Sequence, residues 1–236
     1  MFYGVLAIGI SAMIGYGYRT LRSHPRFAIQ KIDIRGASPT AEQEIRQILL
    51  PVMGHNVFSL DLGSLRQRVV DHPRVSAAVV RGEVSGILHL DVQEHEPAGL
   101  VQVDDRVLVV NHEGDFLGAY DQYGAPLDLP VIIGLEGRED LTERIRNGLS
   151  TLGQIREASL MFWDNIETLD MKNAENMTVS LRSEAAPIYL GQKVIPDNIK
   201  NYLSIAQRVR QEYPRLHYIE LGFPNQVAIL PERAEE

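Results

Sequence analysis

The apolar and polar positions divide the chain into an uncharged N-terminal run and a longer region with alternating and helical patterns. Residues 1–18 contain no charged side chain. As a helix rising about 1.5 Å per residue they would span roughly 27 Å, close to the roughly 30 Å of a bilayer's hydrocarbon core. Tyr16 and Tyr18 lie where an interfacial aromatic belt is expected. We therefore predict a transmembrane anchor at residues 1–18 and a juxtamembrane linker at residues 19–26.

Two other interpretations of the apolar run are weaker. A cleaved signal peptide needs a basic start and a small-residue cleavage site, and residues 11–13 make a poor site. A buried helix is rarely so uniformly apolar. By the positive-inside rule alone, Arg19, Arg22 and Arg26 would place the following region in the cytoplasm, unless a basic segment precedes the run. The charge pattern therefore leaves the orientation open.

Residues 27–97 predict a small α+β domain in the order β-α-α-β-β, with both helices on one face of the sheet. Isoleucines alternate with charged residues in the first strand, which ends at Gly36. A capping box at residues 40–43 opens the first helix, and Asp61 caps the second. The expected elements are a strand at 27–35, helices at 40–52 and 62–69, and strands at 75–81 and 88–92.

Residues 98–231 predict a second, larger domain with a mixed β-sheet and packed helices. Residues 232–236 form a short polar tail. The expected elements are a hairpin of 107–110 with 116–120, strands at 129–134, 166–171, 177–181, 188–190, 218–221 and 227–230, and helices at 141–155 and 197–213.

Composition narrows the possible functions. The formal net charge is -8, and an acidic chain repels phosphate backbones, so no nucleic-acid partner is expected. The chain has no cysteine, which excludes disulfides, thiolate metal sites and cysteine nucleophiles. Glycine-rich phosphate loops and the nucleophile and zinc motifs of common hydrolases are also missing from the sequence.

Two clusters of ionisable residues were considered as chemical sites. His89 and His95 have carboxylates nearby, but six residues along a strand separate them by roughly 20 Å, too far to share a metal ion. Asp104 and Asp105 form a carboxylate pair, but adjacent turn residues usually point apart. We therefore predict no catalytic residue, no metal site, no cofactor and no small-molecule substrate.

A spaced pattern in the first half resembles a known family. It consists of residues 73–75 (Pro-Arg-Val), Arg81, and the series Leu88-x-Leu90-x-Val92-x-Glu94-x-x-Pro97, preceded by residues 32–36 (Ile-Asp-Ile-Arg-Gly). This half is similar to the POTRA domain of the FtsQ/DivIB family of bitopic bacterial cell-division proteins. POTRA domains also occur in transport and assembly proteins.

The second half resembles the β domain of the same family. The similar segments are residues 109–116 (VVNHEGDF), residues 129–134, the pair Leu190-Gly191 and residues 218–223 (YIELGF). The resemblance thus covers about residues 28–231. Three features depart from the family pattern: Ser85 replaces a hairpin proline, Glu220-Leu221-Gly222 replaces Asp-Leu-Arg, and only the nearby Lys172 stands in for a basic partner contact.

The resemblance implies a non-enzymatic scaffold at the division septum, anchored in the inner membrane with most of the chain outside the cytoplasm. It implies FtsB- and FtsL-type bitopic partners, one of which adds a β-strand beside the last strand of the β domain. Phe223 matches the family's aromatic contact, and Asn225 and Gln226 lie on the adjoining turn. The expected partner-binding residues are Phe223, Asn225, Gln226, Val227, Ala228, Ile229 and Leu230.

Other interpretations remain open at this point. Residues 227–230 could form an ordinary core strand, and Phe223 an ordinary core aromatic. A membrane-anchored POTRA chaperone that handles exported polypeptides along its sheet edge is the alternative function. A cell-wall enzyme ranks third, because the sequence offers no catalytic pair.

Overall fold

The structure is a computed structural model of the chain. It describes Met13, Tyr16, Thr20, Arg22 and residues 24–124, 126–135, 140–173, 175–191 and 193–232. Most of the predicted anchor, three of the eight residues of the predicted linker and all but the first residue of the predicted tail lie outside the described residues. Among those that are described, no helix has both the length and the apolar character needed to cross a bilayer.

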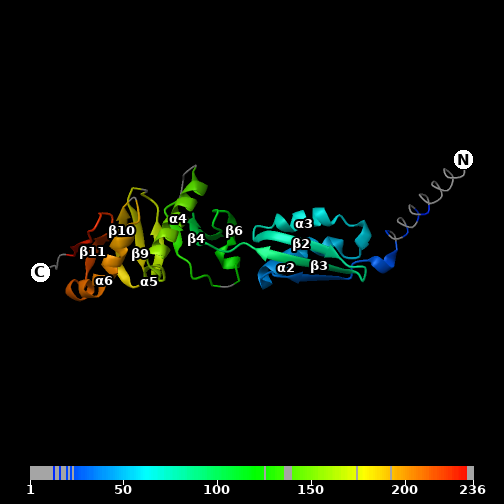
Figure 1. Cartoon of the computed structure of the whole chain (residues 1–236), viewed down its shortest axis with the longest axis horizontal. Helices are drawn as coiled ribbons and strands as arrows, with labels where there is room; N and C mark the ends of the chain where they lie inside the picture. The colour runs from blue at the N-terminus through cyan, green and yellow to red at the C-terminus, as the bar shows by residue number, and fades with distance from the viewer. Residues whose placement is uncertain are drawn as a thin grey trace. The chain divides into compact units, whose positions relative to one another are not determined.

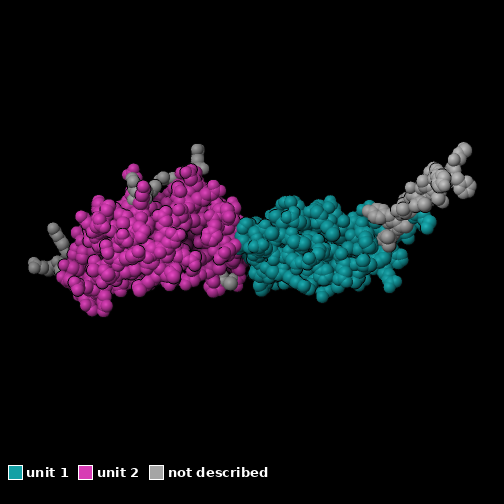
Figure 2. All heavy atoms as spheres, in the orientation of Figure 1, with its two compact units in different colours: residues 1–95 teal, residues 96–236 magenta. Residues whose placement is uncertain are grey.

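The chain divides into two compact units, residues 1–95 and 96–236 (Figure 2). We refer to them as the N-terminal unit and the C-terminal unit. Both mix helices with β-sheet, which confirms the predicted α+β class.

The N-terminal unit has a three-stranded sheet and two helices in the predicted order (Figure 1). The central strand is the last in sequence: it pairs in parallel with the first strand and antiparallel with the second, giving the order β1-β3-β2. Short 3-10 turns lie before β1 and between the helices. The elements are β1 (Lys31–Arg35), α2 (Pro39–Leu49), α3 (Leu62–Val70), β2 (Val75–Gly82) and β3 (Ile87–Glu94).

Local sequence explains where these helices begin. Asp61 caps α3 as predicted, since its carboxylate accepts the amides of Gly63 and Ser64 at 3.0 and 3.1 Å. The predicted capping box at residues 40–43 is wrong. Ser38 is the N-cap of α2 because Pro39, whose fixed φ suits the first helical position, starts the helix there.

The core of the N-terminal unit lies between the sheet and the helices. Alternate residues of β3, among them Leu88 and Leu90, are fully buried against Ile45 of α2 and Val69 of α3. Both helices therefore cover one face of the sheet. Gly36 ends β1 with φ at +81°, and a Cβ there would collide with the Val92 carbonyl of β3, so only glycine fits.

The C-terminal unit contains a nine-stranded mixed sheet in the order β12-β11-β10-β9-β8-β7-β4-β5-β6 (Figure 1). Its strands are β4 (Gly99–Val103), β5 (Arg106–Val110), β6 (Phe116–Ala119), β7 (Val131–Ile133), β8 (Ile166–Asp170), β9 (Met177–Leu181), β10 (Glu184–Gly191), β11 (Leu216–Glu220) and β12 (Ala228–Pro231). Its helices are α4 (Leu141–Ala158), α5 (Leu160–Trp163) and α6 (Pro196–Glu212).

Most elements of this unit occur where the pattern predicted them, including the hairpin of β5 with β6. Two elements were missed. β4 forms a tight hairpin with β5 across the Asp104 turn, where Asp104 has a left-handed φ of 52°. Its run of apolar residues is too short to identify a strand by periodicity. α5 is only four residues long, so it shows no helical period.

The large core of the C-terminal unit lies between the sheet and its three helices. Ile145 of α4, Phe162 of α5 and Tyr202 of α6 are buried in the same cluster as alternate residues of β7 to β11. On the opposite face, a smaller cluster of Leu100, Val109 and Leu117 packs against side chains that include Tyr120, Tyr123, Leu127 and Leu129. The outer face of β8 to β11 carries half-buried and exposed side chains. This part of the sheet is therefore open on the side away from the helices.

Candidate partner-binding edge

The last strand, β12, lies at one edge of the nine-stranded sheet and pairs only with β11. The pairing is antiparallel, with Tyr218 opposite Leu230, Ile219 opposite Ile229 and Glu220 opposite Ala228. A strand with one neighbour leaves every second backbone amide and carbonyl without a ladder partner. The position of β12 therefore fits the predicted open edge.

One hydrogen bond shows to which side the amide and carbonyl groups of each β11 residue point. The amide of Leu221 donates to the Tyr189 carbonyl of β10 at 2.8 Å. Backbone groups of successive residues in a strand point to opposite sides, so Ile219 also faces β10. Tyr218 and Glu220, between them, face β12.

The same alternation fixes which groups of β12 point outward. Leu230 and Ala228 lie opposite Tyr218 and Glu220, so their backbone groups bond to β11. The amide and carbonyl of Ile229 therefore point away from the sheet. Pro231, two residues further on, offers only a carbonyl because proline has no amide hydrogen.

Side chains near this edge are only partly covered. Val227 and Ile229 are half-buried against the large core. Leu230 and Ala228 are exposed, and 43% of Leu230 is accessible. Phe223 is 58% exposed, so it is not a core aromatic, and the core interpretation of residues 227–230 does not hold either.

A tight turn joins β11 to β12 and contains the other predicted contacts. Asn225 has a left-handed φ of 58°, which asparagine tolerates better than most residues. The amide of Gln226 donates to the Phe223 carbonyl at 3.2 Å and closes the turn. Asn225 and Gln226 are both exposed. The structure thus brings all seven predicted site residues together at one edge of the sheet.

Asn198, on the first turn of α6, bonds to the β11–β12 turn from the protein interior. The residue is fully buried, and its amide Nδ2 donates to the Leu221 carbonyl at 2.7 Å and to the Phe223 carbonyl at 2.6 Å. Sequence reasoning missed this residue. An asparagine in a helical first turn is ordinary, and its partners lie more than twenty residues away.

The departure at Gly222 from the family's Asp-Leu-Arg has a structural reason. A Cβ at Gly222 would lie 3.1 Å from the Gly191 Cα at the end of β10, and still closer to Glu220. Glu220 accepts the Gly222 amide through Oε1 at 2.9 Å. A basic side chain at this position would have to displace both neighbours, so the turn here is built around glycine.

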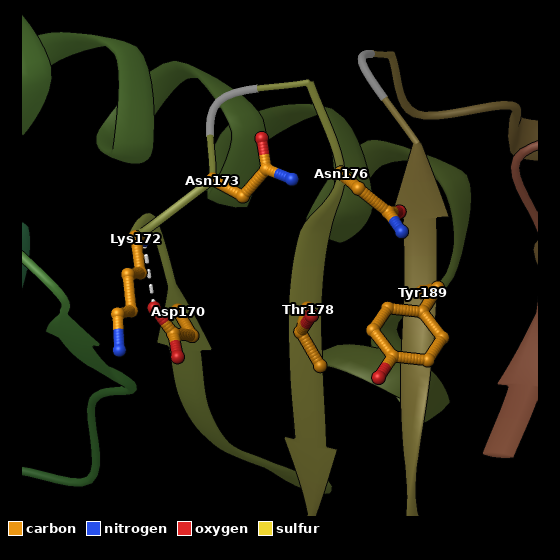
Figure 3. Close-up of a pocket in the computed structure, with 6 residues that line it drawn as sticks. All are labelled: Asp170, Lys172, Asn173, Asn176, Thr178 and Tyr189. Carbon is orange, nitrogen blue, oxygen red and sulfur yellow. Dashed lines mark hydrogen bonds between the residues drawn. The ribbon is translucent and has the colours of Figure 1, made fainter.

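A polar pocket of about 340 Å³ lies on the outer face of the same sheet (Figure 3). Asp170, Thr178 and Tyr189 project to the same side from β8, β9 and β10 (Figure 3). The Lys172 amide donates to Asp170 Oδ1 at 2.7 Å. The ring of Tyr189 packs edge-on against Tyr218, with 5.4 Å between centroids. This pocket therefore lies two strands inward from β12.

The two histidines that the sequence suggested as metal ligands, His89 and His95, each contact their own neighbours. Within the described ranges, no three histidine, aspartate or glutamate side chains are placed to hold a metal ion. His89 contacts Glu83 at 2.9 Å and Asp33 at 3.3 Å, while the His95 amide bonds to the Arg74 carbonyl. The hydrogen bond to Glu83, reinforced by Asp33, raises the pKa of His89 despite partial desolvation.

In the core of the C-terminal unit, burial, reinforced by Glu184, raises the pKa of the Tyr202 hydroxyl to about 12.

Comparison with known sequences agrees with this two-unit architecture. A family model described as "POTRA domain, FtsQ-type" matches residues 27–95, and one described as "Cell division protein FtsQ/DivIB, C-terminal" matches residues 99–221. The protein is thus of the class that joins a POTRA domain to a mixed-sheet β domain. The second match covers more than half of the chain, and the chain belongs to the FtsQ/DivIB family of cell-division proteins.

Several relatives carry the name "Cell division protein FtsQ". The one from Geotalea daltonii is 20% identical over 234 residues, covering 96% of this chain and 84% of its own. The one from Rhodothermus marinus is 24% identical over 237 residues, covering 97% and 85%. The family consists of non-enzymatic members of the bacterial division complex associated with the septum. The matched range ends at Leu221, before the turn and β12.

Proposed function

We propose that this protein is a non-enzymatic divisome scaffold that recruits a partner by β-strand addition to β12. The observation that carries the proposal is the outward-facing backbone of Ile229 at a sheet edge, in a strand that follows the turn with the exposed Phe223. An unprotected edge strand is an aggregation hazard, so an edge that remains available indicates a partner. Membership in a family of division proteins makes a division protein the natural occupant.

The added strand would form a short ladder. The amide and carbonyl of Ile229 and the carbonyl of Pro231 are the available partners. Each such hydrogen bond contributes about 0.5–1.5 kcal/mol net. Proline at the outward position ends the run of donors, and this limits the length and fixes the register of the strand that can bind.

Side chains would supply the selectivity. A partner strand would cover the half-buried Val227 and Ile229 on the core side. On the outer face it would meet Leu230, with the exposed ring of Phe223 as the anchor and the turn residues Asn225 and Gln226 as polar contacts. Aromatic anchors with a polar rim are typical of selective interfaces. The pocket beside Lys172 offers polar groups to any partner segment that continues across the sheet.

We further propose the cellular arrangement that the family resemblance implies. Residues 1–18 would anchor the chain in the inner membrane, and residues 19–26 would link the anchor to a POTRA domain at 27–97 and a β domain at 98–231 outside the cytoplasm. The partners would be FtsB- and FtsL-type bitopic proteins at the septum. Catalysis, cofactors, nucleic acids and small-molecule substrates have no part in this proposal.

The test is substitution of the exposed aromatic. Phe223→Asp should weaken co-purification with an FtsB-type partner by about a hundredfold or more, the loss typical of a central aromatic anchor. Far-UV circular dichroism should not change, because Phe223 is 58% exposed. Leu160→Asp is the matched control, since Leu160 on α5 is 62% exposed in the same unit. Equal partner binding by both variants would overturn the proposal.

A further inference from the structure

An arginine occupies one outward carbonyl at the β1 edge of the N-terminal sheet. Lys31 donates its amide to the Gly86 carbonyl beside β3, so the backbone of the next residue, Ile32, points out of the sheet. The Ile32 carbonyl is not open to an incoming strand: it accepts a hydrogen bond from Arg46 Nη1 of α2 at 3.2 Å. Glu42, one turn earlier on α2, holds the other guanidinium nitrogen at 2.6 Å.

The opposite edge, β2, has the same arrangement. Glu83 donates its amide to the Ile87 carbonyl, which makes Ala77, Val79 and Arg81 of β2 face β3. Ala78 therefore points outward, and its carbonyl accepts a hydrogen bond from Arg66 Nε of α3 at 3.0 Å. Two arginines from two different helices thus reach the two free edges of one three-stranded sheet.

The β1 edge also shows why such protection is needed. A shallow cavity of about 350 Å³ runs beside this strand, between it and α2. Leu50 and Met53 line the cavity and are 57% and 39% exposed. A polypeptide that added to β1 would find both backbone partners and apolar contacts here. Arg46 lies in this cavity, where the added strand would have to pass.

The C-terminal sheet differs at its edges. The side-chain hydrogen bonds nearest to β12 reach Leu221, Gly222 and Phe223, and none in the described part of the chain reaches β12 itself. The other edge strand, β6, is four residues long like β12, and a register shift interrupts the pairing of each strand with its neighbour. Neither length nor regularity therefore distinguishes the two edges of this sheet.

We propose that Arg46 and Arg66 block strand addition to the N-terminal sheet, so that, among the described strands, an added strand is directed to the C-terminal sheet, where β12 is the proposed acceptor. A guanidinium on an outward carbonyl occupies the acceptor that an incoming amide needs and places a charge in its path. The two arginines thereby determine specificity, and they disfavour the alternative in which the POTRA sheet binds many extended polypeptides. The blocking role does not depend on which partner β12 binds.

The test removes both arginines from the full chain. Arg46→Ala/Arg66→Ala should shift the protein from monomer to dimer or larger species in sedimentation velocity. It should also bind a fluorescent peptide with the sequence of residues 29–36, to which the unmodified chain shows no saturable binding. Arg68→Ala is the matched control, because Arg68 of α3 bonds to the Ile48 carbonyl within α2 rather than to a strand.

A double lysine variant distinguishes the loss of edge blocking from a loss of folding. Arg46→Lys/Arg66→Lys keeps a charge at each edge and should remain monomeric and unable to bind the peptide. If the double alanine variant loses the circular dichroism signal of the folded protein, the two single alanine variants replace it in the test. Each single variant should open one edge to strand addition. Folded alanine variants that stay monomeric and do not bind the peptide would overturn the inference. Binding of the division partner at β12 should be unchanged in all folded variants.

Discussion

The edge strands of the two sheets differ in whether side chains bond to their outward backbone groups. In the N-terminal unit, the outward carbonyls of Ile32 and Ala78 each accept an arginine hydrogen bond. In the C-terminal unit, the outward groups of Ile229 have no such partner in the described region, and the exposed Phe223 lies on the turn that leads into β12. Both sheets have similar backbone chemistry. On our proposal, side chains outside the strands decide which edge is available for binding.

The strongest test of this contrast concerns the residue that positions the open edge. Asn198→Asp replaces an amide that donates to two carbonyls with a buried carboxylate that would repel them. We expect the free energy of unfolding to fall by about 3 kcal/mol or more, and partner binding to fall with it. Urea denaturation followed by circular dichroism measures the change.

Asn201→Asp is the control for that variant. Asn201 lies on the same helix but is exposed, so the same chemical change should alter the free energy of unfolding by less than about 0.5 kcal/mol. Equal stability of the two aspartate variants would show that Asn198 does not hold the turn before β12.

A smaller effect, confined to binding, is expected at the backbone of β12. Ile229→Pro removes an amide that points away from β11, so the sheet loses no internal hydrogen bond. Partner affinity should fall roughly tenfold relative to Ile229→Ala, which controls for the lost side chain. Isothermal titration calorimetry with an FtsB-type partner measures the difference.

Leu230→Pro is the comparison within the same strand, because it removes an amide that faces β11 rather than one that faces away from it. Its amide faces β11, so this substitution should destabilise the C-terminal unit rather than act on binding alone. If Ile229→Pro proved the more destabilising of the two, the derived register of β12 would be wrong.

The smallest expected effect concerns the solvent face of the N-terminal sheet, where His89 of β3 bridges Glu83 and Asp33. The contact with Glu83 raises the pKa of His89, so its stabilising contribution is fully present below about pH 6.5, the ordinary histidine pKa. That contribution is lost as pH rises through the higher pKa of the folded state. Thermal unfolding midpoints should therefore decline over this range.

His89→Gln should flatten that decline and leave the C-terminal unit unaffected. The lowered pKa of Glu83, caused mainly by its hydrogen bond with His89, acts in the other direction: its contribution is lost as pH falls through the acidic range. Calorimetric scans from pH 4 to 8 would measure both the loss of stability at high pH and the loss at low pH. An identical pH dependence in both proteins would rule out a stabilising role for this bridge.

The sequence was informative where a pattern is local. Alternation identified β3, helical periodicity identified α4 and α6, and the position of residues 227–230 at the end of the domain indicated an edge strand. These features depend on neighbours in the chain, so periodicity detects them.

The rest depends on contacts between distant segments. The outward direction of the Ile229 backbone groups follows from the hydrogen bond between Leu221 and Tyr189. These two residues are more than thirty positions apart in the chain. The roles of Arg46 and Arg66 depend on which strand carbonyls lie within reach of each helix. Arginines on a helix surface are common, so no sequence pattern separates these two from Arg68.

The most direct test of the account is hydrogen exchange at single amides of β12, measured by NMR before and after addition of an FtsB-type partner. We predict that the Ile229 amide exchanges rapidly in the free protein and becomes protected in the complex, while the Leu230 amide is protected in both states. Protection that instead appeared along β1 or β2, with Ile229 unchanged, would contradict strand addition at β12.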